Sequence, residues 1–304
     1  MKILFFGTSE FAIPALKKLH ESEYEIAGVI TRPDKRAGRK QELSPTPVKE
    51  AALALGLKVY QPDEMDLEIP AADVFVVASY GKIIPAEIIN LPKHGSLNIH
   101  PSLLPKYRGP SPIQTAILSG DRETGVTIIK LDREMDHGPL LAQRRIKNYE
   151  LRIKYKQLHD LLAETGADLL MEILTKYLNG EIKLLPQDDT RATFTKIITK
   201  NDARIDWRKS AEEIDRLVRA YGGWPVAWTR LGAKRLKIYE ADVHTSVRTS
   251  VRTPGEIAAA LGRLFVNCGE NQLEILALQL EGKQKMSAAE FLKGQRAIAG
   301  KRLR

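Results

Sequence analysis

Two side chains able to stabilise an oxyanion and to move a proton stand at the end of one apolar run. Residues 96–100 read Ser-Leu-Asn-Ile-His, and Pro101 follows directly. In a strand, the side chains of Asn98 and His100 project from the same face. An amide can donate to a developing oxyanion, and an imidazole can move a proton. The spacing predicts a catalytic pair, and the alternative is a pair that only hydrogen-bonds the end of its strand.

An acidic cluster at residues 132–138 offers a carboxylate for this pair. At the end of a strand, a carboxylate can hold His100 in one tautomer and stabilise its protonated form. Asp136 is the candidate because Gly138 follows closely and supports a tight turn. Two alternatives remain open. The cluster can be a solvated turn, and His137 can compete with His100 as the partner of Asp136.

The surrounding elements predict a parallel sheet that would position these residues. Apolar runs at 2–6, 25–31 and 73–79 predict strands, and helical spacing at 10–20 predicts a crossover helix with Ser9 as its cap. Such a βαβ opening indicates a parallel sheet with right-handed crossovers. Ligands bind at the carboxyl ends of the strands in open α/β sheets, which is where Asn98 and His100 would lie.

The character of the sequence changes after a long predicted helix at residues 155–178. A polar, extended stretch follows, and then an amphipathic helix and several short strands separated by turns. Short strands with turn signals suggest a small barrel or sandwich. We predict a catalytic domain at 1–188, a linker at 189–207 and a small basic domain at 208–304.

The basic excess of the chain lies entirely in its C-terminal part. Residues 1–188 hold 25 basic and 25 acidic side chains, whereas residues 189–304 hold 22 basic and 13 acidic ones, so the latter carry the whole net charge of +9. This asymmetry suggests an anionic partner such as nucleic acid. Solubility alone accommodates the same charge, and both interpretations stay open.

The composition of the 304-residue chain is that of a globular protein with room for more than one domain. The sequence shows neither an apolar run of membrane-spanning length nor a signal peptide. A single cysteine, Cys268, excludes an intrachain disulfide, and the six histidines show no metal-ligand spacing. We expect a cytoplasmic protein that uses no metal and contacts no membrane, with Cys268 as a small buried side chain.

Further motifs surround the candidate residues. Ser102-Leu103-Leu104-Pro105 and Tyr107-Arg108-Gly109 follow the Asn98 strand, and Tyr80-Gly81-Lys82-Ile83-Ile84-Pro85 precedes it. Together with Asn98, His100 and Asp136, they resemble the signature of the 10-formyltetrahydrofolate-dependent formyltransferase family. Segments at 202–207, 211–216, 224–225 and 285–291 resemble the branch of that family that acts on methionyl-tRNA. The resemblance covers nearly the whole chain.

This resemblance implies a Rossmann-like catalytic domain and a C-terminal β-barrel, OB-like, that helps to hold tRNA. The implied reaction transfers the formyl group of 10-formyltetrahydrofolate to the free α-amine of methionyl initiator tRNA, for translation initiation. Asn98 would donate to the oxyanion, His100 would assist charge and proton movement, and Asp136 would orient His100 and help to take the amine proton. The alternatives are a sugar-nucleotide N-formyltransferase with the same folate donor and a non-catalytic RNA-binding protein.

The resemblance also places both substrates. The folate would lie against Ser102, Leu103, Leu104 and Pro105, and a monomer is expected. A loop over residues 32–47 would reach the acceptor end of tRNA, with phosphate contacts from its basic residues Arg32, Lys35, Arg36, Arg39 and Lys40. The alternative for this loop is a solvated surface. Trp207, Trp224 and Trp228 are expected in the core rather than stacked on nucleotides.

Overall fold

The computed structural model describes residues 1–37, 42–63, 69–147, 152–245, 253–295 and 297–304. The chain forms two compact units. The first comprises Met1–Pro112, Glu123–Lys147 and His159–Lys196, and the second comprises Ile113–Arg122, Asn148–Leu158 and Ile197–Arg304.

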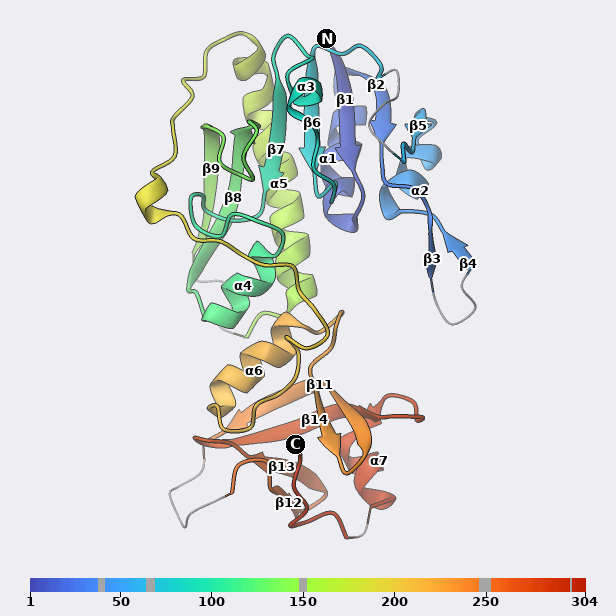
Figure 1. The fold of residues 1–304 in the computed structure, drawn as a ribbon, viewed down its shortest axis with the longest axis vertical. Helices are drawn as coiled ribbons and strands as arrows, with labels where there is room; N and C mark the ends of the chain where they lie inside the picture. The colour runs from blue at the N-terminus through green and yellow to red at the C-terminus, as the bar shows by residue number, and fades with distance from the viewer. Residues whose placement is uncertain (38–41, 64–68, 148–151, 246–252, 296) are drawn as a thin grey trace. The chain divides into compact units, whose positions relative to one another are not determined.

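A seven-stranded sheet forms the centre of the first unit, in the order β5-β2-β1-β6-β7-β8-β9 (Figure 1). These strands are β1 (Lys2–Gly7), β2 (Glu25–Ile30), β5 (Val59–Tyr60), β6 (Val74–Ala78), β7 (Ser96–His100), β8 (Glu123–Lys130) and β9 (Leu140–Lys147). Pairing is parallel from β5 to β7 and antiparallel from β7 to β9. The parallel-dominated sheet confirms the predicted α/β class, with two antiparallel strands added at one edge.

The central strands are buried on both faces, as their continuous apolar sequences indicate. Every residue of β6 is buried, and so are Ile3 to Gly7 of β1. The loops that follow these two strands are tied together, because the Thr8 hydroxyl donates to the Tyr80 carbonyl at 2.6 Å. The carboxyl ends of β1 and β6 therefore form one fixed edge beside β7.

Helices and short helical turns surround this sheet. They are η1 (Glu10–Ala12), α1 (Ile13–His20), α2 (Pro47–Ala54), α3 (Ala86–Ile89), α5 (Tyr155–Leu178) and η2 (Asp189–Arg191). Helix α4 (Pro112–Ser119) belongs to the second unit from Ile113 onwards. The helix predicted over 10–20 is divided into η1 and α1, and Ser9 makes no side-chain cap bond. Pro14 lies in the first turn of α1, where a missing N–H breaks no helical bond.

The loop predicted over residues 32–47 contains a short hairpin, so this prediction was wrong in part. Strand β3 (Lys35–Ala37) pairs antiparallel with β4 (Glu42–Ser44). All three residues of β4 are exposed, so this strand has no alternation of buried and exposed positions for the sequence to reveal. Residues 38–41 lie outside the described residues.

The second unit is built on a six-stranded antiparallel sheet, with the path β10-β11-β14-β13-β12 and β15 paired to β14. Its strands are β10 (Trp228–Leu231), β11 (Lys234–His244), β12 (Ile257–Ala260), β13 (Arg263–Asn267), β14 (Gln272–Leu280) and β15 (Met286–Ser287). Helices α6 (Ala211–Ala220) and α7 (Ala288–Lys293) both start with a capping box. The antiparallel sheet agrees with the predicted fold class.

Residues near the C-terminus join the two ends of this sheet. Leu303 bridges Leu231 of β10, and Arg302 bridges Glu256, which precedes β12. The barrel core includes Trp207, whose indole N–H donates to Thr229 Oγ1 at 3.0 Å. Closure through the chain end satisfies main-chain groups that an open edge would expose.

The core prediction holds for two of the three tryptophans. Trp207 and Trp228 are buried, whereas Trp224 is 59% exposed, so the prediction was wrong for Trp224. Cys268 is buried as expected, and its burial raises the pKa of the thiol to about 12. The neutral thiol is therefore the form present at physiological pH.

The described residues contain neither a membrane-spanning helix nor a cluster of metal ligands. None of their helices has the length and apolarity needed to cross a membrane. Their His, Cys, Asp and Glu side chains form no group of three or more that could hold a metal ion.

Helix α5 approaches the sheet directly behind the strand that carries Asn98 and His100. A Cβ atom on Gly166 would lie 2.6 Å from Cγ2 of Ile99 in β7 and 3.2 Å from Cγ1 of Val126 in β8. Both neighbours are β-branched and therefore stiff at χ1. The absent side chain lets the helix backbone pack closely against β7.

We expect Gly166→Ala to lower the free energy of unfolding by about 1 kcal/mol and by no more than about 2 kcal/mol. Overpacking a filled core costs about 1–3 kcal/mol, which exceeds the roughly 1 kcal/mol that alanine gains in helix propensity. Urea unfolding measures the difference, with Thr165→Ala in the same helix as the control. A variant as stable as the parent would contradict the close approach.

Candidate active site

Strand β7 places Asn98 and His100 on one face at its carboxyl end. In the sheet, Asn98 lies between Val77 of β6 and Ile129 of β8, and His100 lies opposite Thr127. His100 is buried, with 4% of its surface exposed, and Asn98 is half-buried. The pair therefore stands where parallel and antiparallel halves of the sheet meet.

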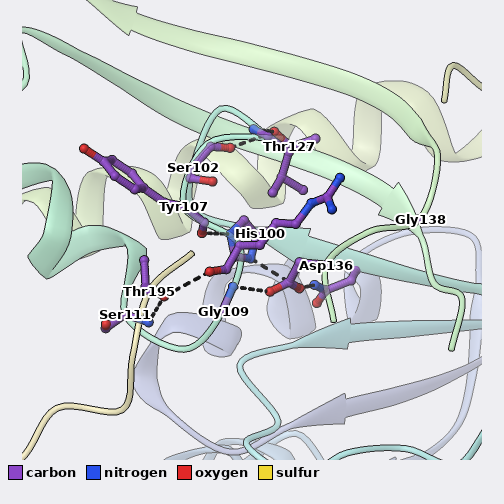
Figure 2. A network of polar contacts seen from close by, with 12 residues as sticks. His100, Ser102, Tyr107, Gly109, Ser111, Thr127, Asp136, Gly138 and Thr195 are labelled. Carbon is purple, nitrogen blue, oxygen red and sulfur yellow. Dashed lines mark hydrogen bonds and ion pairs between the residues drawn. The ribbon is translucent and has the colours of Figure 1, made fainter. Parts of the chain in front are cut away.

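The Asp136 carboxylate completes a compact polar cluster with this pair, and Figure 2 shows it beside His100 and Gly109. Its Oδ1 atom accepts a hydrogen bond from Asn98 Nδ2 at 3.3 Å and lies 3.5 Å from His100 Nδ1. Its Oδ2 atom accepts from the Gly109 main-chain N–H at 2.8 Å. The structure thus brings together all three residues that the sequence analysis selected.

The other nitrogen of His100 is held by the loop after β7. His100 Nε2 lies 2.9 Å from the Tyr107 carbonyl oxygen. A carbonyl oxygen only accepts, so this network assigns a proton to Nε2. The Nδ1 atom then faces Asp136 and is the ring position able to exchange a proton at the site.

Two tight turns carry the groups that surround the carboxylate. Asp136 has φ of 51° and Tyr107 has φ of 64°, both in the left-handed region that non-glycine residues seldom adopt. Gly138 follows, and its φ does not lie in the left-handed region. A Cβ atom there would lie 1.8 Å from the Lys130 carbonyl oxygen, so glycine is needed for close approach.

Residues 102–105 form a loop held by its own polar groups. The Ser102 hydroxyl donates to the Lys106 carbonyl at 2.6 Å, and the Leu104 N–H donates to Thr127 Oγ1 at 3.1 Å. Ser102 and Leu104 are buried, whereas Leu103 and Pro105 are partly exposed. The loop offers a bound molecule an apolar surface rather than the serine hydroxyl.

The predicted basic loop is only partly described. Lys35 and Arg36 lie on β3 and are exposed, whereas Arg39 and Lys40 lie outside the described residues. Arg32 is half-buried, and its guanidinium lies close to Gly81 in the loop after β6. Arg32 therefore lies beside the loop after β6, whereas Lys35 and Arg36 lie exposed on the hairpin.

His137 turns away from Asp136 towards other carboxylates. Its Nδ1 atom lies 2.6 Å from Asp132 Oδ2, and its Nε2 atom lies 3.5 Å from Asp189 Oδ2. The hydrogen bond with Asp132 is the main cause that raises the pKa of the His137 imidazole. His100 is the histidine whose ring faces Asp136.

Two groups that shape this site were not among the predicted residues. The Gly109 N–H holds Asp136, and the buried Arg108 guanidinium donates to Asp189 Oδ1 at 2.6 Å. Both residues belong to the motif Tyr107-Arg108-Gly109, to which no role was given. Main-chain donors leave no signature in residue type, although the positive φ of 110° at Gly109 is typical of glycine.

The cluster has the parts needed for attack of a nucleophile on a carbonyl carbon. An amide donor can face a developing oxyanion, and a carboxylate beside an imidazole can take and return a proton. The half-buried Asn98 and the buried His100 limit access of water, which strengthens such interactions.

The comparisons with known proteins identify the family. The formyl transferase family matches residues 1–174, and the formyl transferase C-terminal domain matches residues 197–296. The methionyl-tRNA formyltransferase of Caldanaerobacter subterraneus subsp. tengcongensis is 42% identical over 308 residues, covering 99% of each chain. That of Chloroflexus aggregans is 44% identical over 306 residues, covering 98% of each.

Solved structures share the fold at lower identity. An N-formyltransferase from Helicobacter canadensis, in complex with folinic acid and dTDP-3-aminofucose, has a TM-score of 0.69 at 18% identity, covering 94% of this chain and 100% of its own. HypX from Aquifex aeolicus in complex with tetrahydrofolic acid has a TM-score of 0.67 at 20% identity, covering 98% of this chain and 48% of its own. From the two domain matches and the full-length relatives, this chain belongs to the formyltransferase family and, within it, to the methionyl-tRNA formyltransferases.

Proposed function

We propose that this protein transfers the formyl group of 10-formyltetrahydrofolate to the free α-amine of methionyl initiator tRNA, for translation initiation. The observation that carries the proposal is that Asn98 and His100 both face the Asp136 carboxylate. Full-length relatives of this chain bear the proposed activity in their names. The reaction forms a bond between the amine nitrogen and the formyl carbon and breaks the bond from that carbon to folate N10.

Each residue of the cluster has a role in this proposal. Asn98 donates to the formyl oxygen as negative charge develops there, because an amide carbonyl is a poor electrophile without such help. Asp136 takes the proton that the attacking amine loses. His100, held at Nε2 by the Tyr107 carbonyl, stabilises the charge and passes a proton towards the leaving N10.

The folate is a substrate in this reaction, and residues 102–105 are proposed to lie against it. Leu103 and Pro105 are partly exposed and supply apolar contact, whereas Ser102 and Leu104 hold the loop in shape. The side chain of Leu104 is buried, so its contribution is structural. We therefore expect the folate to contact Leu103 and Pro105 directly.

The tRNA is proposed to contact the basic hairpin. Lys35 and Arg36 are exposed on β3, and the hairpin follows β2, whose carboxyl end lies in the same parallel set as β7. Arg32, Arg39 and Lys40 belong to the same proposal. Exposed cations that project from a short hairpin can hold phosphates without reading sequence.

The remaining assignments complete the proposal. We propose a catalytic domain at 1–188, a linker at 189–207 and a tRNA-binding domain at 208–304, acting as a cytoplasmic monomer. A sugar-nucleotide N-formyltransferase would share the catalytic residues and the folate. The relatives of about 40% identity over nearly the full chain favour the tRNA substrate, since solved sugar formyltransferases are only 18–21% identical.

The first test measures transfer of labelled formyl from 10-formyltetrahydrofolate to methionyl initiator tRNA, with an amino-sugar nucleotide in parallel. We expect formylation of the tRNA alone. Formylation of the sugar alone would keep the chemistry and overturn the substrate. Tight tRNA binding with transfer to neither acceptor would favour the RNA-binding alternative.

We expect Asn98→Ala to lower kcat by about 100-fold or more, because loss of one oxyanion donor costs that much in comparable sites. Its affinity for the tRNA should stay within about twofold of the parent. Asn179→Ala, at an exposed asparagine of the same unit, is the control. A large loss of tRNA affinity with normal kcat would remove Asn98 from this role.

We expect Lys35→Ala combined with Arg36→Ala to weaken tRNA binding and to reduce the slope of log Kd against log salt concentration by about 1–2, since each lost phosphate contact releases about 0.7–0.9 fewer counterions. The matched control replaces Lys176 and Lys183, two exposed lysines of the same unit. An unchanged slope would exclude the hairpin from the tRNA site.

The raised pKa of His137 predicts a pH-dependent contribution to stability. The protonated ring is stabilised in the fold, so the contribution is complete below the unfolded value of about 6.5 and is lost as pH rises through the folded value. We expect His137→Gln to cost more at pH 6 than at pH 8.5, by less than about 1 kcal/mol because the side chain is partly exposed. Urea unfolding measures this, and Asp132→Asn should reduce the same difference, because Asp132 supplies the largest of the contributions that raise this pKa.

A further inference from the structure

Residues 185–195 of the first unit, here named the strap, pair with both loops of the site. Leu185 forms an antiparallel bridge with Leu140, directly after the Asp136 turn. Phe194 forms a parallel bridge with Arg108, and the Thr195 N–H donates to the Arg108 carbonyl at 2.7 Å. The strap therefore connects the loop that presents the Gly109 N–H to the loop that presents Asp136.

One side chain of the strap points inwards between these pairings. Gln187 is half-buried, whereas Leu185, Pro186, Asp188 and Asp189 are exposed. Its Nε2 atom donates to the main-chain carbonyls of Asp136 and Gly138, each at 2.8 Å. A single amide group thus holds the main chain on both sides of His137.

The orientation of this amide is fixed from the opposite side. Gln187 Oε1 accepts two hydrogen bonds from the buried Arg108, from Nε at 3.0 Å and from Nη2 at 2.8 Å. Guanidinium groups only donate and carbonyl groups only accept, so the oxygen and nitrogen of the amide have unique positions. Asp189 balances the Arg108 charge.

The main chain of Asp136 needs such a restraint. Its φ of 51° costs roughly 1–2 kcal/mol for a residue other than glycine. Conformations of this kind persist where the surrounding structure holds them. Gly109 fixes the carboxylate end of the residue and Gln187 fixes its carbonyl end, so the side-chain direction towards Asn98 and His100 is determined at both ends.

We propose that Gln187 is a positioning residue for formyl transfer, which holds Asp136 in the geometry that faces Asn98 and His100. Its side-chain amide acts through the main-chain carbonyls of Asp136 and Gly138, and not through a hydrogen bond to Asn98 or His100. This inference rests on the proposed function for its kinetic readout. Its structural readout is independent of that function.

The test uses two substitutions of Gln187 in the full chain. Gln187→Glu keeps the size and the acceptors for Arg108 but places an oxygen against the two carbonyls, and Gln187→Met removes all four bonds without adding charge. Asn90→Asp is the matched control, because the Asn90 amide donates to a single helix carbonyl at 2.8 Å. Formyl transfer, thermal midpoint and hydrogen exchange of the Gly109 amide are measured for each.

We expect both Gln187 variants to lower kcat by about 10–100-fold with KM for either substrate within about twofold, as displacements near 1 Å do. The Gly109 amide should exchange at least about tenfold faster, since Asp136 no longer holds it, while the control matches the parent. Normal kcat per folded molecule together with normal Gly109 exchange would overturn the inference. A parent enzyme without formyl transfer would refute the proposed function, and Gly109 exchange would then decide the role of Gln187 alone.

Discussion

The site depends on one carboxylate that accepts a hydrogen bond on each of its two oxygens. Asp136 receives the Gly109 N–H on one oxygen and faces Asn98 and His100 with the other. A carboxylate with a donor on each oxygen keeps its orientation without help from a ligand, so the cluster of Asn98, His100 and Asp136 has this geometry before any substrate binds. In the proposed reaction, this preorganisation means that little rearrangement is needed as charge develops.

Close backbone approach makes this arrangement possible at several places. Gly138 lets the Asp136 turn touch the Lys130 carbonyl, and Gly166 lets α5 pack directly behind β7. Gly109 passes under the Thr195 carbonyl, where a Cβ atom would lie 2.8 Å away. In each case a side chain would clash with a neighbouring group, so glycine allows the strand, loop or helix to come this close.

The second unit meets a different requirement, because residues near the C-terminus cover part of both edges of its antiparallel sheet. Its terminal residues bridge both β10 and the residue before β12, and Trp207 lies in its hydrophobic core. The basic excess of the sequence lies in the part of the chain that forms most of this unit. The core of this unit is apolar, so most of its basic side chains lie outside the core and can face an anionic partner.

The sequence by itself determined the types of most elements and the identity of the central residues. Local patterns of apolar residues are enough to predict three features of the fold. These are strands β1 and β6, the shared face of Asn98 and His100, and the long helix α5. The selection of Asp136 over His137 as the partner of His100 also rested on neighbouring residues, and the geometry agrees with it.

Only the tertiary structure decided how these residues are held. The Gly109 N–H and Asp136 are 27 residues apart, and Gln187 and Asp136 are 51 apart, so no local pattern records either contact. Gln187, at the end of the predicted catalytic domain, lies against the Asp136 turn, and Trp224 lies exposed although its type favours a core. Local sequence determines which way a strand alternates, whereas long-range packing determines which main-chain groups meet across the fold.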